Sequence, residues 1–197
     1  MSKPRETKTI KLDDPRSLRA LAHPLRLELM ALLRSRGPLT ATEAAALTGE
    51  SPGNCSFHFR QLAKWGLVEE ADHGPGRQRP WRATADVTTW GAGIGSEGRA
   101  ATQQLNRALA ERYVAGLLKW YADRDSEEAE WVAAANTTDV MFRLTVDELV
   151  RLNADLRAVL TWWAEATADR SLTSASRVVQ FVGWTYPLPP SSPGDRT

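Results

Sequence analysis

Two short helix-forming segments separated by one glycine place the tightest constraint on how this chain can fold. Thr40-Ala-Thr-Glu43 has the spacing of a capping box, in which the threonine hydroxyl accepts from the Glu43 amide and the glutamate reaches back. The helix that it opens is expected to close at Gly49, and Ser51-Pro52 then starts a second helix with a capping residue and a proline. Two short helices joined by a tight glycine-containing turn are typical of a helix-turn-helix.

Two more helices are predicted before this motif. Asp14-Pro15 is a capping residue followed by proline, and leucines then recur at steps of three and four residues as far as Leu33. Pro24 interrupts this run, so we expect two short helices that meet near His23.

A hairpin is predicted directly after the motif. Residues 67–71 and 80–84 have the composition of short strands, and His73-Gly-Pro-Gly-Arg77 between them has that of a turn. A hairpin in this place is the wing of a winged helix.

The second half of the chain is predicted to mix long helices with two strands. The expected elements are a long helix over 97–123, a short helix over 127–135, a strand over 140–144, a helix from the capping box Thr145-Val-Asp-Glu148 to about Trp163, and a strand over 178–186. The fold class is therefore mainly α (α+β), with a winged helix-turn-helix domain followed by a helical dimerisation region that contains a small strand–helix–strand element.

Composition and charge divide the chain of 197 residues into parts. Residues 1–95 carry 14 Lys and Arg against 10 Asp and Glu, and residues 96–197 carry 11 against 14, so a basic half precedes an acidic one. We expect a flexible basic arm over 1–12, a DNA-binding domain over 13–90, a glycine-rich joint over 91–98, a helical (α+β) dimerisation region over 99–188 for which an effector role is the alternative, and a disordered tail over 189–197.

Three stretches in the first half carry a resemblance to a known family. They are LRALAHPLRLELMALL, SPGNCSFHFRQLAKWGLVEE and the glycine-containing wing that ends in RPWRAT. Together they cover about a third of the chain and resemble the ArsR-type winged-helix transcriptional regulators. The resemblance implies a two-fold dimer that places one recognition helix per subunit in successive major grooves of DNA.

The helix that starts at Ser51 is the predicted recognition helix. A period of 3.6 residues puts Cys55, Phe59 and Leu62 on a face that packs on the core. Asn54 and Gln61, on the opposite face, are side chains that pair with adenine edges. The predicted DNA-binding residues are Ser51, Asn54, Ser56, Phe57, His58, Arg60, Gln61 and Lys64 on the helix, with Arg77 and Arg79 on the wing. A packing role for His58 is the alternative, and Cys55 is favoured as a small buried hydrophobe over a redox sensor.

Catalytic, metal and membrane functions find little support in the sequence. One cysteine and three histidines in separate elements, His23, His58 and His73, do not have the spacing of metal ligands. The glycines of 93–98 match a dinucleotide-binding fingerprint, but 86–90 reads as a poor buried strand, so a flexible joint is favoured. We expect no enzymatic activity, cofactor or metal, no membrane partner, and a cytoplasmic location.

Eight tryptophans are many for this length, and five of them follow the joint. The favoured interpretation is core and dimer interface, with the long helix over 97–123 as the dimer seam. An aromatic pocket for a small-molecule effector is the alternative, built from Trp120, Trp162, Trp163 and Trp184. The predicted function is sequence-specific binding of double-stranded DNA by a homodimer that represses transcription at an inverted repeat. A winged-helix adaptor that binds other proteins is the second hypothesis.

Overall fold

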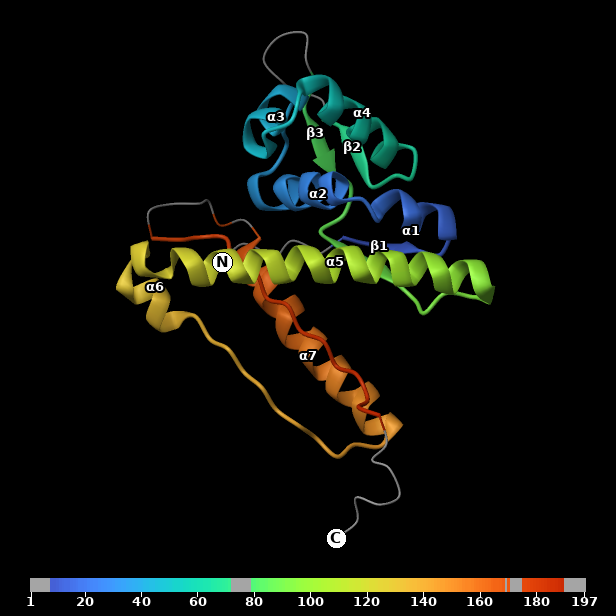
Figure 1. Cartoon of the computed structure of the whole chain (residues 1–197), viewed down its shortest axis with the longest axis vertical. Coiled ribbons are helices and arrows are strands. Elements are labelled where there is room, and N and C mark those ends of the chain that lie inside the picture. The colour runs from blue at the N-terminus through green and yellow to red at the C-terminus, as the bar shows by residue number, and fades with distance from the viewer. Residues whose placement is uncertain (1–7, 72–78, 169, 171–174, 190–197) are drawn as a thin grey trace. The chain divides into compact units, whose positions relative to one another are not determined.

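The fold is described from a computed structural model that covers residues 8–71, 79–168, 170 and 175–189 (Figure 1). Contacts divide the chain into one compact unit over Arg5–Thr137 and a second that includes Thr138–Thr197. The first unit contains the helices α1 Pro15–Leu21, α2 Pro24–Arg36, α3 Ala41–Thr48, α4 Pro52–Ala63, α5 Gly95–Asp123 and α6 Ala129–Ala134, and the strands β1 Thr9–Leu12, β2 Val68–Glu70, β3 Trp81–Ala83 and β4 Val87–Trp90. The second contains α7, Val146–Thr167.

The predicted helix starts of the helix-turn-helix are confirmed by their hydrogen bonds. Thr40 Oγ1 accepts from the amide of Glu43 at 3.2 Å, and the Thr40 amide donates to Glu43 Oε2 at 2.7 Å. Ser51 Oγ accepts from the amide of Asn54 at 3.1 Å. Gly49 ends α3 with φ at 73°, a left-handed conformation that favours glycine. Each N-cap is worth about 1 kcal/mol, so these local bonds set the bounds of α3 and α4.

The hydrophobic core lies where α1, α2 and α4 meet. Cys55, Phe59 and Leu62 of α4 are fully buried, as the helical period predicted, and they join Leu29 of α2 in one cluster. The burial of large apolar side chains against three helices holds α4 in place and leaves its other face outside.

The hairpin predicted as a wing forms from β2 and β3, which pair antiparallel with Val68 opposite Ala83. Trp81 of β3 also bridges to Leu39, and its ring stacks on Phe59 with 5.6 Å between centroids. The base of the wing therefore packs against α4, the predicted recognition helix. Its tip, 72–78, lies outside the described residues.

A parallel pair of strands corrects two sequence expectations. β1 pairs with β4 in register from Thr9 opposite Val87 to Leu12 opposite Trp90. The prediction of a flexible arm over 1–12 is wrong for 9–12, because their backbone bonds to β4 and Leu12 is buried. Residues 87–90, read as a poor strand, do form one, although it is half exposed and has a single partner. A pairing between segments so far apart leaves little local signal.

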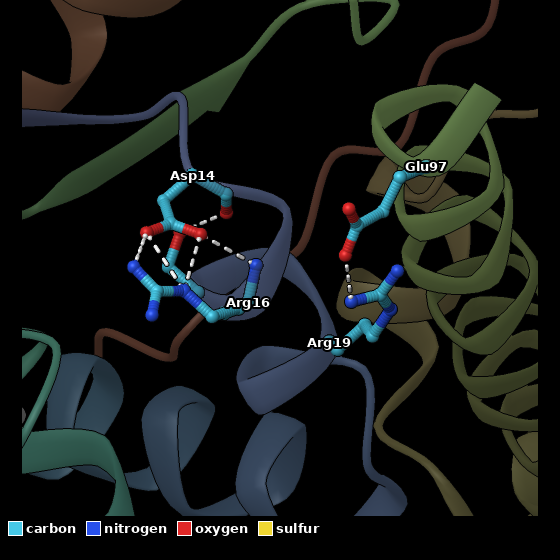
Figure 2. A network of polar contacts seen from close by, with 5 residues as sticks. Asp14, Arg16, Arg19 and Glu97 are labelled. Carbon is cyan, nitrogen blue, oxygen red and sulfur yellow. Dashed lines mark hydrogen bonds and ion pairs between the residues drawn. The ribbon is translucent and has the colours of Figure 1, made fainter. Parts of the chain in front are cut away.

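Helix α5 shares the core of the winged helix. Ala101 and Leu105 are fully buried in the same cluster, and α5 packs along α1. Figure 2 shows Arg19 of α1 pointing toward Glu97 of α5, with 2.8 Å between Nη1 and Oε1. The compact unit therefore continues across 91–98 without a break. The division of the chain into DNA-binding and dimerisation parts stays a prediction.

The glycines before α5 have a structural reason. Gly93 has φ at 79°, and a Cβ there would lie 2.3 Å from the backbone of Gly98. The segment makes a close turn from β4 into α5 that a side chain at Gly93 would block.

The C-terminal unit is built on α7. Its predicted capping box is confirmed, since the Thr145 amide donates to Glu148 Oε2 at 2.7 Å. The predicted strands over 140–144 and 178–186 are wrong, because neither joins a sheet within the described residues. The second of these segments runs along α7 (Figure 1), where Thr185 Oγ1 donates to Asn153 Oδ1 at 2.8 Å.

Candidate nucleic-acid interface

The outer face of α4 is the first part of the candidate interface. Because Cys55, Phe59 and Leu62 anchor one side of the helix, the residues on its other side point away from the core. The structure leaves Ser51, Phe57, Arg60 and Lys64 exposed, and it half-buries Asn54, Ser56 and Gln61. Phe57 is 48% exposed, a high value for a phenylalanine on a helix. Seven of the eight residues predicted on this helix are therefore accessible.

The polar side chains of this face bond to one another. Arg60 Nη1 donates to Ser56 Oγ at 3.2 Å, and Lys64 Nζ donates to Gln61 Oε1 at 3.5 Å. These contacts are on the surface and each costs little to exchange. The face thus presents amide, hydroxyl and cationic groups that can change partners when a ligand arrives.

Glu50 is a residue of this face that the sequence analysis missed. Asn54 Nδ2 donates to Glu50 Oε2 at 2.8 Å across the start of α4. Glu50 therefore brings a negative charge to the start of α4, next to Ser51, one of the predicted DNA-binding residues. A phosphate that binds at this end would meet the like charge of Glu50. The sequence signal that could have identified Glu50 is its position one residue before the capping serine.

His58 is a correction, because it is buried rather than on the outer face. Its ring lies 4.5 Å from the ring of His23, between centroids, and its Nδ1 is 3.4 Å from Arg26 Nη1. The guanidinium of Arg26 also donates to the carbonyl of Ala20. His58 therefore has the packing role that was the alternative to DNA contact. A ring in this position presents no edge to a molecule bound at the outer face of α4.

Burial and charge act together on the histidine pair. Burial lowers the pKa of His23, and the Arg26 guanidinium lowers it further. Burial also lowers the pKa of His58, with His23 and Arg26 acting in the same direction and Glu50 against them. The two histidines that looked separate in the sequence are neighbours, and the adjacent cation makes them poor ligands for a metal cation.

The wing brings two arginines beside two glutamates. Arg79 Nη1 lies 3.2 Å from Glu70 Oε2, and Arg82 Nε lies 2.8 Å from Glu69 Oε1. All four side chains are exposed, so a phosphate can compete for the arginines. Arg77, the other predicted wing residue, lies outside the described residues.

The tryptophans predicted as an effector pocket fall in both units. Trp162 and Trp163 of α7 meet edge to face with 4.8 Å between centroids, and both are exposed. Trp184 is also exposed, and Trp120 belongs to α5 in the first unit. The pocket stays a prediction.

The described ranges contain neither a group of metal-ligating side chains nor a membrane-spanning helix. Over those ranges, no three His, Cys, Asp or Glu side chains gather as metal ligands would. No helix found there is long and apolar enough to span a bilayer.

Comparisons with known proteins identify the domain at this site. Residues 21–71 match a family described as a helix-turn-helix domain. No curated protein matches the chain. A helix-turn-helix is a motif that places its second helix in the major groove of DNA, so the match supports a DNA-binding regulator.

Several solved structures are similar to this chain. One is described as a possible transcriptional regulator for arsenical resistance, at 27% identity over 57% of this chain and 96% of that one, with a TM-score of 0.31. A second is a transcriptional regulator homologue from Pyrococcus horikoshii OT3. It is 23% identical over 50% of this chain and 87% of that chain, with a TM-score of 0.31. A third is wild-type MarR from E. coli in its apo form. It is 18% identical over 74% of this chain and 87% of that chain, with a TM-score of 0.31. These TM-scores are too low to support a closer comparison.

Proposed function

We propose that this protein is a sequence-specific regulator of transcription of the ArsR type, which binds double-stranded DNA as a homodimer and represses at an inverted repeat. In this proposal α4 reads base edges in the major groove, and the wing arginines Arg77 and Arg79 contact the backbone. The single observation that carries it is the outer face of α4, which presents Asn54, Gln61 and two cations beside a fully buried inner face.

The length and chemistry of that face fit a major groove. Twelve residues of α4 span about 18 Å, and a major groove about 12 Å wide admits a helix. Asn54 and Gln61 can each pair with an adenine edge once they leave their present partners. Arg60 and Lys64 lie where the groove is bordered by phosphates, and Phe57 can contact a thymine methyl group.

The proposed dimer seam is the C-terminal half of α5. Val114, Leu117, Leu118 and Tyr121 are between 45% and 61% exposed, and their spacing puts them on one side of the helix. The buried residues of α5, such as Leu105, belong to the other side. A helix that packs on its own core at one end and displays an apolar stripe at the other is suited to pairing with a second copy.

An effector is a separate part of the proposal. Adjacent Trp162 and Trp163 form an aromatic pair that a planar molecule can cover. Titration of the intrinsic fluorescence with a panel of small aromatic molecules tests this, and a flat response across the panel counts against an effector at these rings.

The experiment for DNA binding is capture of sheared genomic DNA by the purified full-length protein at two salt concentrations, followed by sequencing. We expect a few enriched fragments that share an inverted repeat and survive the higher salt. Non-specific binding weakens steeply with salt because it comes from phosphate contacts alone. Capture without sequence preference that disappears with salt would refute the proposal.

The adaptor hypothesis is separated from DNA binding by the same experiment. A variant with Asn54→Ala and Gln61→Ala removes two base-reading groups and keeps the cations of α4. If this variant still enriches the same fragments as the wild type, α4 does not read sequence, and the adaptor becomes the better account of the fold.

A further inference from the structure

Glu50 is an exposed carboxylate at the end of the candidate interface where α4 begins. Its hydrogen bond within the described chain is the contact with Asn54, an uncharged amide. The wing glutamates Glu69 and Glu70 differ from it, because each of them pairs with an arginine. No lysine or arginine of the described ranges forms an ion pair with Glu50. The charge of Glu50 is therefore not neutralised by the part of the interface that the structure describes.

The bond between the two side chains fixes the orientation of the amide. An ionised carboxylate accepts hydrogen bonds and donates none, so Asn54 must turn Nδ2 toward Glu50, as it does at 2.8 Å from Oε2. Glu50 Oε1 and Asn54 Oδ1 make no hydrogen bond to any other described residue. The start of α4 thus holds two acceptor groups side by side.

This end of α4 is the part that meets base edges in the proposed complex. In a helix-turn-helix, the N-terminal residues of the second helix contact the edges of bases in the major groove. Neighbouring base pairs are about 3.4 Å apart along DNA, close to the separation of the Glu50 and Asn54 side chains. When Asn54 turns to an adenine edge, the carboxylate is left without its donor beside the next base pair.

A carboxylate in that place distinguishes between bases. A charged acceptor that gives up water without finding a donor loses free energy, so the base pair beside it must supply an N–H group. Cytosine presents its N4 amino group in the major groove and is the usual partner of a glutamate. Guanine presents only the acceptors N7 and O6, which repel a carboxylate.

We propose that Glu50 is a specificity-determining residue, whose carboxylate accepts from the N4 amino group of a cytosine next to the base pair read by Asn54 and disfavours a guanine there. The inference rests on the proposed function and deepens it, because it specifies a base that the half-site must contain. Phosphates repel the same carboxylate, so Glu50 lowers affinity for DNA of every sequence and discriminates by penalising the wrong base more than the right one.

The test is selection of duplexes from a library of random sequence by the purified full chain, with sequencing of the bound fraction. Asn54→Ala identifies the base pair that Asn54 reads, as the position whose preference disappears. We expect the wild type to select cytosine beside that position. In Glu50→Ala the preference for cytosine over guanine should fall by about 10-fold, the usual effect of one mismatched base pair, while the adenine preference remains.

Two further variants separate the carboxylate from its charge. Glu50→Gln keeps the shape of the side chain and adds an N–H donor, so guanine should no longer be excluded. Glu28→Gln removes the same charge from an exposed position on α2 and is the matched control. It should keep the cytosine preference of the wild type. Fluorescence anisotropy with a random-sequence duplex should show tighter binding by both Glu50 variants than by this control, because the charge they lose is the one nearest the DNA.

The outcomes distinguish this inference from the proposed function. If the wild type selects a sequence without cytosine beside the position read by Asn54, or if Glu50→Ala keeps the cytosine preference, the inference is overturned and DNA binding stands. A Glu50→Ala variant that changes only the base pair read by Asn54 also overturns it, because Glu50 then acts by positioning Asn54. A wild type that retains all duplexes alike overturns the proposed function, and the inference with it.

Discussion

His23 and His58 show how a contact between distant residues changes the role of a side chain. The helical period put His58 on the outer face of α4, yet its ring packs on His23 and beside Arg26. His23 Nδ1 is buried with no hydrogen-bond partner among the described residues. A neutral ring tolerates this environment better than a charged one, since both burial and the nearby guanidinium disfavour the imidazolium.

The histidine pair predicts a pH dependence of stability. The pKa of each ring is lowered from its ordinary value of 6.5, so the unfolded chain binds more protons than the folded one below that value. The contribution to the free energy of unfolding is complete above pH 6.5 and is lost as the pH falls below it. Urea denaturation from pH 7.5 to 5 measures this, with Arg26→Gln, which removes the nearby charge, expected to flatten the slope.

A variant without the pair provides the control. His23→Gln with His58→Gln removes both titrating rings, so the part of the slope that they cause should vanish. If this variant loses stability with falling pH as steeply as the wild type, other groups cause the effect.

The outer face of α4 predicts that substitutions in the protein will change DNA binding in two different ways. Asn54→Ala or Gln61→Ala should relax the preference at particular base pairs, by about 1–3 kcal/mol for each lost bidentate contact. Lys64→Ala or Arg77→Ala should weaken binding to all sequences alike and reduce the salt dependence. Fluorescence anisotropy with operator, mismatched and random duplexes measures both.

The matched control for the amide variants is on another helix. Gln104→Ala on α5 removes the same kind of side chain from an exposed position outside the face of α4, and its binding should equal that of the wild type. Equal effects from the amide and the cation variants would mean that the division of α4 into reading and phosphate-contacting residues is wrong.

At the scale of elements, α5 links the winged-helix core to the proposed dimer seam. One end of it buries Ala101 and Leu105 in the common core, and the other end displays an apolar stripe. Because the buried end fixes the direction of the helix relative to α1, the stripe is carried at a set place on the DNA-binding unit. A dimer formed through this stripe would set the separation of its two copies of α4.

The apolar stripe on α5 predicts that a charge placed in it will reduce the gain in affinity from binding two half-sites together. Leu118→Glu puts a charge among the exposed apolar residues and should weaken the dimer and its affinity for a full inverted repeat, while affinity for one half-site is unchanged. Ala115→Glu, exposed but outside the stripe, is the control. Titration of full and half operators measures the difference. A drop at the half-site as well would point to damage in the winged helix.

At the scale of the whole molecule, the proposal predicts that DNA affinity depends on the spacing between the two half-sites of the operator. Two copies of α4 that enter successive major grooves need half-sites with centres about 10–10.5 base pairs apart, or a multiple of that. Inserting about five base pairs between half-sites should therefore reduce affinity to that of a single half-site. Inserting about ten should restore part of it, as measured by mobility shift. Equal binding to all spacings would refute a dimer of fixed geometry.

The sequence by itself determined the local structure of the first half. The helix starts at Asp14, Thr40 and Ser51, and the buried face of α4 were all predicted, because capping and helical periodicity involve residues three or four apart. The accessible residues of the candidate interface follow from the same period. Such signals survive in the sequence because each is complete within one element.

The tertiary structure alone decided what distant segments do to one another. It paired β1 with β4, moved His58 inside against His23, and joined the start of α5 to the winged-helix core. It also left 140–144 and 178–186 extended but outside any sheet of the described chain. A strand depends on a neighbour that its own residues do not specify, and a face of a helix is buried only where another element reaches it. Composition marks a segment as able to pair, and the arrangement of the whole chain determines whether it does.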